Sequence, residues 1–225
     1  TGLLPLRLAR EAGRYIVNVA VTFGSNVQRR AGRAEELEHA CGFLGWDLYR
    51  EAAKRQAGGE AAFEALDAGD IAEILRGAPP AVLFVPHGND WNSRHVSTHG
   101  LVMKALEAMP DDFACTVVET EYWMPMAEPN LMVEADAETL ADLVAALSFH
   151  VKEVERNPYH LSLPAWMRDN VRRGGELVGG QGGAVPDFSF ASLYRVRRWE
   201  GGALVPCWDG GRVLSMRDSA ADLPG

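Results

Sequence analysis

The sequence predicts an α/β fold, a Rossmann-like three-layer sandwich with a mostly parallel central sheet. Segments with helical periodicity alternate along the chain with short apolar runs, which is typical of βαβ units. These runs are almost continuously apolar, as expected of strands that helices cover on both faces. The 225 residues contain no polar linker and can bury one sizeable core, so we expect a single domain over residues 1–225.

The first elements are a helix and a strand. Leucines at helical spacing predict a helix over residues 1–13, and Gly13 is a suitable stop for it. Residues 14–24 read RYIVNVAVTFG, and this apolar run predicts a strand of a doubly covered parallel sheet. A turn follows at residues 24–26.

The next segments continue the alternation. Apolar residues recur at helical spacing over residues 33–44, and Gly45 ends this predicted helix. The segment WDLYR (46–50) predicts a short second strand. A further helical pattern at residues 60–75 leads through two prolines into the next strand.

The rest of the chain repeats this order. AVLFVP (81–86) is the clearest buried strand, and a helix over residues 96–109 follows it. FACTVVETEYW (113–123) predicts another strand. Near the end, residues 174–188 are glycine-rich and predict a loop, and residues 189–199 predict a late strand.

Charge and hydropathy exclude two classes of protein. With 31 acidic and 22 basic side chains the net charge is −9, which disfavours a nucleic-acid surface. No apolar run approaches the ~20 residues of a membrane span. One basic group, Arg29, Arg30 and Arg33, departs from the acidic character of the chain. It is compatible with a solvated helix start and with an anion-binding role, and both remain open.

The cysteines indicate a reducing compartment. Cys41, Cys115 and Cys207 lie far apart and outside any C-x-x-C spacing. Reduced thiols explain this pattern most simply, so we expect a cytoplasmic protein.

Candidate site residues follow the buried strand at 81–86. His87, Asp90, His95 and His99 all come after its carboxyl end, where α/β folds bind their ligands. His95 and His99 are four residues apart, so both imidazoles project from one side of the predicted helix. This spacing suits a metal ligand with a supporting partner, or two ligands, although core and surface roles give the same spacing.

A catalytic zinc needs three protein ligands, and the remaining candidates are weak. His39 fits a packing or surface position, and His150 and His160 are equally compatible with structural roles. Glu119 and Glu121 could reach the same edge of the sheet, but an exposed, alternating strand end is the favoured interpretation. The sequence has no G-x-S-x-G elbow and no glycine loop placed to bind a dinucleotide.

The segment NSRHVSTH (92–99) resembles the H-P-D-H-x-x-x-H motif of the PIG-L/LmbE family of zinc-dependent N-acetyl-sugar deacetylases. Five other segments resemble motifs of the family more loosely, and they follow one another in the same order and at similar spacing. They are TGLL (1–4), VAVTFGS (19–25), RAEELEHACGFLG (33–45), AALSFH (145–150) and FSFASLYR (188–195).

The resemblance implies a role for several residues. His95 matches the third zinc ligand, His99 the final histidine of the motif, and Arg33 an arginine near the substrate. Asn92 stands where many members have a histidine implicated in stabilising the transition state. Asparagine can donate a hydrogen bond there but cannot carry a proton, and whether His87 or His99 takes over that task is open.

The family's H-P-D-D-E motif, which supplies two zinc ligands and the aspartate base, is absent from this sequence. It should lie a few residues before Thr1, and Thr1 is not a methionine. We therefore expect the first strand and this motif to precede Thr1.

The resemblance implies an enzyme that hydrolyses a linear amide, provided that the upstream metal motif exists; for the 225 residues alone this is open. The expected reaction is zinc-dependent removal of the N-acetyl group from an N-acetylglucosamine-type sugar or glycoside, releasing acetate, with another divalent metal as an alternative cofactor. The expected partner is a small amino-sugar substrate, and self-association is open. A noncatalytic sugar-binding module or an inactive fragment of the same fold is the alternative. The site residues we expect are Asn92, Asp90 and His99 in catalysis, Arg33 and His87 in substrate binding, and His95 on the metal.

Overall fold

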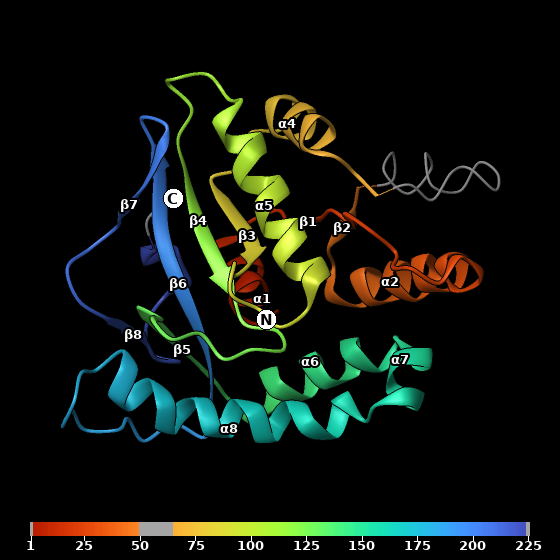
Figure 1. The fold of residues 1–225 in the computed structure, drawn as a ribbon. Coiled ribbons are helices and arrows are strands. Elements are labelled where there is room, and N and C mark those ends of the chain that lie inside the picture. Colours follow the sequence, from red (N-terminus) through yellow and green to blue (C-terminus); the bar gives the residue numbers. More distant parts are fainter. Residues whose placement is uncertain (1, 50–64, 224–225) are drawn as a thin grey trace.

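The structure is a computed structural model that describes residues 2–49 and 65–223. Its main sheet has the order β3-β4-β6-β5-β8, with β7 paired to β6 (Figure 1). The strands are β3 Val82–Pro86, β4 Cys115–Thr120, β5 Leu131–Ala135, β6 Phe190–Glu200, β7 Ala203–Pro206 and β8 Arg212–Leu214. The strands predicted at 81–86, 113–123 and 189–199 are thus confirmed as three neighbours, β3, β4 and β6.

The sheet is mixed, so the prediction of a mostly parallel sheet is wrong. β3 runs parallel to β4 and β5 runs parallel to β8, but β6 runs antiparallel to β4, β5 and β7. Helices α6 (Ala137–Ser148) and α8 (Tyr159–Leu177) connect β5 to β6 and pack against each other. Together they return the chain to the end of the sheet where β5 stops, so Phe190 pairs with Ala135 and β6 runs the other way.

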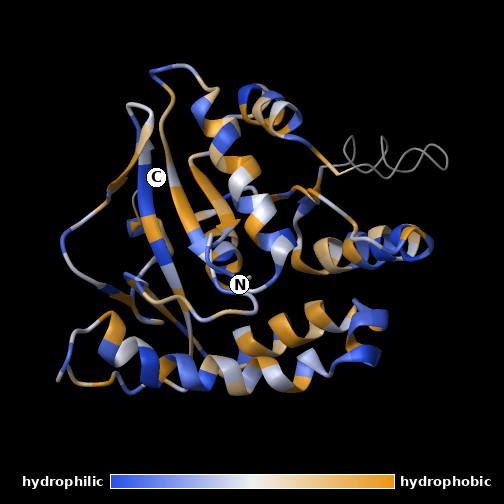
Figure 2. Cartoon of the chain, in the orientation of Figure 1, coloured by the Kyte–Doolittle hydropathy of each residue, from blue (hydrophilic) through white to orange (hydrophobic). Residues whose placement is uncertain are grey.

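Helices cover both faces of the sheet, which confirms the layered α/β architecture. In β4, Val118 packs in a core with α1 (Leu3–Ala12) and α6, whereas Val117 packs in a second core with α4 (Ala68–Gly77) and α5 (Ser93–Glu107). Figure 2 shows apolar residues along β3 and β4, between these layers. The remaining helices are α2 Arg30–Leu44, α7 Val151–Arg156, and the short 3-10 helices η1 Val27–Arg29 and η2 Ala220–Asp222.

The predicted helices differ from the observed ones mainly at their ends. The helix predicted at 33–44 begins earlier, at Arg30, and the first residues of the helix predicted at 60–75 lie outside the described part of the chain. None of the helices in residues 2–49 and 65–223 is long and apolar enough to span a membrane.

The glycine-rich segment at 174–188 is only partly a loop, because α8 continues to Leu177. A Cβ added at Gly174 would lie 2.4 Å from the sulfur of Met132 and 2.9 Å from a methyl group of Leu193. Gly174 therefore allows α8 to lie close to β5 and β6, and its role is in packing.

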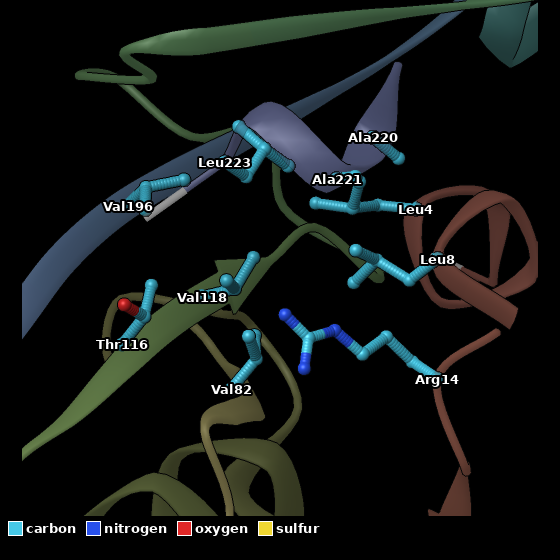
Figure 3. A pocket seen from close by; sticks show the side chains of 10 residues that line it. All are labelled: Leu4, Leu8, Arg14, Val82, Thr116, Val118, Val196, Ala220, Ala221 and Leu223. Carbon is cyan, nitrogen blue, oxygen red and sulfur yellow. The ribbon is translucent and has the colours of Figure 1, made fainter. Parts of the chain in front are cut away.

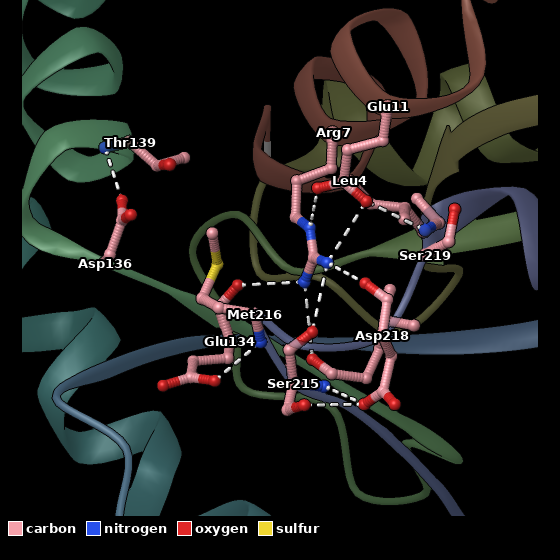
Figure 4. Close-up of polar contacts among 12 residues, drawn as sticks. Leu4, Arg7, Glu11, Glu134, Asp136, Thr139, Ser215, Met216, Asp218 and Ser219 are labelled. Atoms are coloured by element: carbon pink, nitrogen blue, oxygen red, sulfur yellow. Dashed lines mark hydrogen bonds and ion pairs between the residues drawn. The ribbon is translucent and has the colours of Figure 1, made fainter.

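Helix α1 is held to the sheet by a buried arginine (Figure 4). Arg7 is 2% exposed, forms an ion pair with Glu11 and donates to the carbonyl oxygens of Ser215 (3.0 Å) and Asp218 (2.8 Å). These bonds satisfy a guanidinium group that would otherwise be costly to bury. They also fix the C-terminal segment against α1.

A second anchor of α1 is the amide of Leu4, which donates to the hydroxyl of the buried Tyr194 on β6. Beside it lies a small apolar cavity of about 10 Å³ between α1, β3, β4 and the C-terminal segment (Figure 3). The side chain of Arg14 points toward Leu8 and Val82 at the border of this cavity. Because the cavity is so small, α1 is closely packed on the sheet.

The strand predicted at 14–24 is far shorter than expected and lies outside the main sheet. Only β1 (Val17–Asn18) is a strand, and it pairs in parallel with β2 (Asp47–Leu48) in a separate two-stranded sheet (Figure 1). The prediction of a short strand at 46–50 is confirmed by β2. Residues 19–24 have the composition of a buried strand but pair with no neighbouring strand of the described chain, so they remain irregular.

Candidate active site

Polar side chains gather where β3 ends and α5 begins. His87 follows β3 directly, its amide donates to the carbonyl oxygen of Thr120, and its Nε2 lies 2.9 Å from the carbonyl oxygen of Met124. Helix α5 begins earlier than predicted because Asn92 caps it, accepting a hydrogen bond from the amide of Arg94 (3.0 Å). The predicted position of the cluster at the carboxyl end of β3 is thus confirmed.

Asp90 joins two loops of this site. Its buried carboxylate accepts hydrogen bonds from the amides of Asn92 (2.7 Å), Trp123 (2.9 Å) and Met124 (3.3 Å). Burial favours a higher pKa for Asp90, but these donors and the nearby His95 outweigh burial and hold the pKa below its usual range. Asp90 is therefore an ionised anchor between the loop before α5 and the loop after β4.

His95 lies against this anchor. Its Nδ1 is 3.2 Å from Oδ1 of Asp90, and its ring packs on Tyr122 with 4.5 Å between ring centroids. The contact is close but not aligned as a hydrogen bond, so the buried Nδ1 has no hydrogen-bond partner among the described residues. A carboxylate beside one imidazole nitrogen, with the other nitrogen available, is the usual environment of a histidine that binds a metal.

His99 lies one turn further along α5, on the same side as His95, as the spacing predicts. Its Nδ1 is 2.9 Å from the carbonyl oxygen of Pro86 and 3.7 Å from the carboxylate of Glu119. A Cβ on Gly88 would lie 3.1 Å from the His99 ring, so this imidazole is packed tightly against the end of β3. His99 therefore packs between α5 and the carboxyl end of β3.

The expectation that Glu119 and Glu121 form an exposed strand end is wrong. They are 4% and 5% exposed. Glu119 pairs with Arg197 of β6 at 2.6 Å, and Glu121 pairs with Arg173 of α8 at 2.8 Å. Both carboxylates are buried because an arginine from a distant part of the chain reaches each of them.

Arg33 lies in the first turn of α2. Its guanidinium donates to the carbonyl oxygen of Phe23 (2.8 Å) and pairs with Glu153 of α7 (2.7 Å). Gly24 has a φ of +91°, and a Cβ there would collide with this guanidinium, so glycine is needed for the contact. Arg29 also reaches Glu153, at 3.3 Å.

This basic group is therefore neither a simple solvated helix start nor a set of free cations. Burial favours a higher pKa for Glu153, but the hydrogen bond from Arg33 and the surrounding arginines lower the pKa overall. Arg30 donates to the carbonyl oxygen of Gly24. The arginines fix the loop at Phe23 and Gly24 to α2 and α7.

A cavity of about 1070 Å³ opens between β1, α2, α4, β3 and α5. Arg33 and His95 line it, whereas His87, Asp90, Asn92 and His99 are not among its lining residues. His150, for which the residue pattern favoured no role, also lines it. Burial lowers the pKa of His150, although Glu36 and Glu153 oppose this, so the imidazole tends toward its neutral form. The resemblance of AALSFH to a family motif is the sequence signal that pointed to this position.

The described residues do not by themselves fit a catalytic metal ion. No three His, Cys, Asp or Glu side chains in residues 2–49 and 65–223 gather closely enough to hold one. His95 has the surroundings of a ligand, but one ligand cannot hold a catalytic zinc. Any complete metal site at His95 needs ligands from beyond the described residues.

No protein-family model and no curated protein matches the sequence. Solved structures match over most of the chain. An N,N'-diacetylchitobiose deacetylase from Pyrococcus horikoshii is 14% identical, with a TM-score of 0.54, covering 92% of this chain and 82% of that one. The pseudoaglycone deacetylase Dbv21 is 14% identical, with a TM-score of 0.56, covering 87% of this chain and 90% of that one.

A third match is GalB, a 4-carboxy-2-hydroxymuconate hydratase from Pseudomonas putida. It is 14% identical, with a TM-score of 0.60, covering 86% of this chain and 88% of that one. Because this hydratase has the same fold as the two deacetylases, the fold alone does not fix the reaction. The chain has the fold of the PIG-L/LmbE-type deacetylases that its sequence resembles.

Proposed function

We propose that this protein is a zinc-dependent N-deacetylase that removes the acetyl group from an N-acetylglucosamine-type sugar or glycoside. One observation carries the proposal: His95 lies against Asp90 in the wall of a large cavity that Arg33 also lines. Deacetylases among the structures of the same fold support it, and one of them is named for an N-acetyl sugar. The unpaired Cys41, Cys115 and Cys207 support a cytoplasmic location.

In this proposal, each side chain of the cluster has a defined task. His95 would provide one metal ligand, and the carboxylate of Asp90, 3.2 Å from its Nδ1, would favour the charge that develops on the ring. His99 and His87 hold the end of β3 and the loop after β4 through carbonyl oxygens. Arg33 faces the cavity and orients the sugar, with Glu153 setting its position. A zinc ion, when bound, would polarise the amide carbonyl group.

Asn92 would donate a hydrogen bond to the developing oxyanion. Its Oδ1 is used by the amide of Arg94, so the cap leaves the side-chain NH₂ as the group available for a substrate. The cap also fixes the side chain at the first turn of α5, close in sequence to His95. The side-chain amide of Asn92 would thus supply the hydrogen bond attributed to the histidine that many family members have at this position. It would not transfer a proton.

The test is measurement of zinc content and of free amine released from N-acetylglucosamine derivatives. It uses the polypeptide with the segment encoded directly upstream of Thr1, because the remaining ligands are proposed to lie there. We expect about one zinc per chain, as in mononuclear hydrolases, together with turnover. Zinc-free protein without turnover would overturn the proposal. The absence of three described ligands favours a sugar-binding module as the second candidate, and sugar binding without turnover would identify it.

The exchange Asn92→Asp separates the two tasks of this residue. Aspartate keeps an oxygen that caps α5 but removes the NH₂ donor. We expect the turnover rate to fall by about 10²-fold to 10³-fold, the usual cost of losing one transition-state donor, while the melting temperature stays close to that of the parent protein. An unchanged rate in Asn92→Asp would show that Asn92 only caps the helix.

A further inference from the structure

The lining of the large cavity is basic, although the protein as a whole is acidic. The chain has a net charge of −9. Among the described residues that line the cavity, Glu153 is the only carboxylate, whereas Arg14, Arg33 and Arg94 supply guanidinium groups. An acidic protein repels anions over most of its surface, so this positive lining is a local arrangement that attracts a negatively charged ligand.

The single carboxylate of the lining is already used. Glu153 pairs with Arg33 at 2.7 Å, and Arg29 (3.3 Å) and Arg156 (2.6 Å) also reach its oxygens. Three guanidinium groups thus share one carboxylate. The charges of the other two lining arginines have no counter-ion in the described wall of the cavity.

Arg94 is the lining arginine beside the candidate site. It lies in the first turn of α5, directly before His95, and both side chains line the cavity. Its backbone amide binds Asn92, but its guanidinium group makes no hydrogen bond or ion pair with residues 2–49 and 65–223. The closest carboxylate in the sequence, Asp90, accepts from three backbone amides and lies against His95. A planar fork of N–H donors that fits carboxylate and phosphate groups is therefore available next to the site.

Helix stability does not explain an arginine at this position. Arg94 lies at the positive end of the helix macrodipole, where a cation is disfavoured and an anion is favoured. The first turn of α5 contains no acidic residue that would offset its charge. In the H-P-D-H-x-x-x-H motif that residues 92–99 resemble, an aspartate occupies this position, so the charge is reversed here. The arginine is thus a property of this chain and not of the motif.

We propose that Arg94 binds an anionic group, a phosphate or a carboxylate, which the amino-sugar substrate carries close to its acetamide. The assignment rests on the proposed function, in which His95 marks the position of the acetamide. Because Arg94 and His95 are consecutive, the anion lies on the sugar ring or on its first substituent and not in a distant part of a long aglycone. Arg33, whose charge Glu153 compensates, would contact uncharged hydroxyl groups of the same sugar.

Binding of four sugars, measured by titration calorimetry, tests this anion site without requiring turnover. N-acetylglucosamine is the uncharged reference, its 1-phosphate and 6-phosphate carry a phosphate at different positions, and N-acetylmuramic acid carries a carboxylate. The protein is the one used for the zinc measurement. We expect at least one anionic sugar to bind about 10-fold to 100-fold more tightly than the reference, as a charge-assisted hydrogen-bonded pair provides.

Three variants assign the preference to one side chain. Arg94→Ala should reduce the affinity for the preferred sugar to about that of the uncharged reference. Arg94→Lys should keep part of the preference, because an ammonium group retains the charge but not the planar fork. Arg14→Ala is the matched control and should keep all of it. Arg14 lines the same cavity, but its side chain points toward Leu8 and Val82, at the other end of β3 (Figure 3).

Several results would overturn the proposal. They are equal or undetectable affinity of the parent protein for the four sugars, a preference that survives in Arg94→Ala, and a preference that is lost in Arg14→Ala. Inorganic phosphate that binds as tightly as the sugar phosphates would also refute it, because the anion site would then have no link to a sugar. Absence of turnover together with an Arg94-dependent preference would refute the proposed reaction and leave the anion site in place.

Discussion

Replacing Asp90 with alanine is expected to lower the free energy of unfolding by about 3 kcal/mol or more. Three backbone N–H groups, from Asn92, Trp123 and Met124, would lose their acceptor, and each such loss costs at least about 1 kcal/mol. The loop before α5 and the loop after β4 would also lose the group that joins them. Urea denaturation with linear extrapolation measures the change.

Asp90→Asn is the matched variant. An amide keeps one acceptor oxygen, so it can satisfy the amide of Asn92 or those of Trp123 and Met124, but not all three. We expect a destabilisation between zero and that of Asp90→Ala. A loss below 1 kcal/mol in Asp90→Ala would show that water or other groups replace the carboxylate.

The same residue predicts a pH dependence. The folded-state pKa of Asp90 is lower than its unfolded value of about 3.9, so the folded protein binds fewer protons than the unfolded chain near that pH. The stability that Asp90 contributes is therefore complete above about pH 5 and is lost as the pH falls through the folded-state pKa. The parent protein should lose more stability than Asp90→Ala between pH 5 and pH 3, and equal losses would contradict the lowered pKa.

The centre of the site is predictable because its signals are local. An apolar run that ends at Pro86 and is followed at once by polar residues marks the carboxyl end of a strand, where the structure places the histidine cluster. The four-residue spacing of His95 and His99 fixes their common helix face without any tertiary information. These features depend on neighbours within about one turn of helix or one strand.

The burial of Glu119 and Glu121 was not predictable from the sequence, because their partners lie 78 and 52 residues away, at Arg197 and Arg173. The direction of β6 likewise depends on how α6 and α8 return the chain to the sheet. The short length of β1 has a different cause: its composition is that of a central strand, but one of its edges faces the cavity. In the first two cases the deciding contact is distant in sequence, and in the third a neighbour on one edge is missing among the described residues.

Arg173→Ala is expected to lower the free energy of unfolding by about 3–5 kcal/mol, because it would leave Glu121 as an uncompensated buried charge. Arg173 binds both carboxylate oxygens of Glu121, at 2.8 and 3.2 Å, and also donates to the carbonyl oxygen of Met126. Glu121 in turn accepts from the amide of Met126. The pair therefore fixes both ends of the loop at residues 121–126 to α8.

The neighbouring exchange Arg172→Ala is a matched control, because Arg172 pairs with Asp169 on the exposed side of the same helix and should leave the stability nearly unchanged. Combining Arg173→Ala with Glu121→Gln should cost less than the sum of the single changes, since the amide removes the buried charge. Trp123 and Met124, whose amides bind Asp90, lie within this loop. Denaturation of the four variants would thus measure how firmly α8 holds the candidate site in place, and equal stabilities of Arg173→Ala and Arg172→Ala would show that it does not.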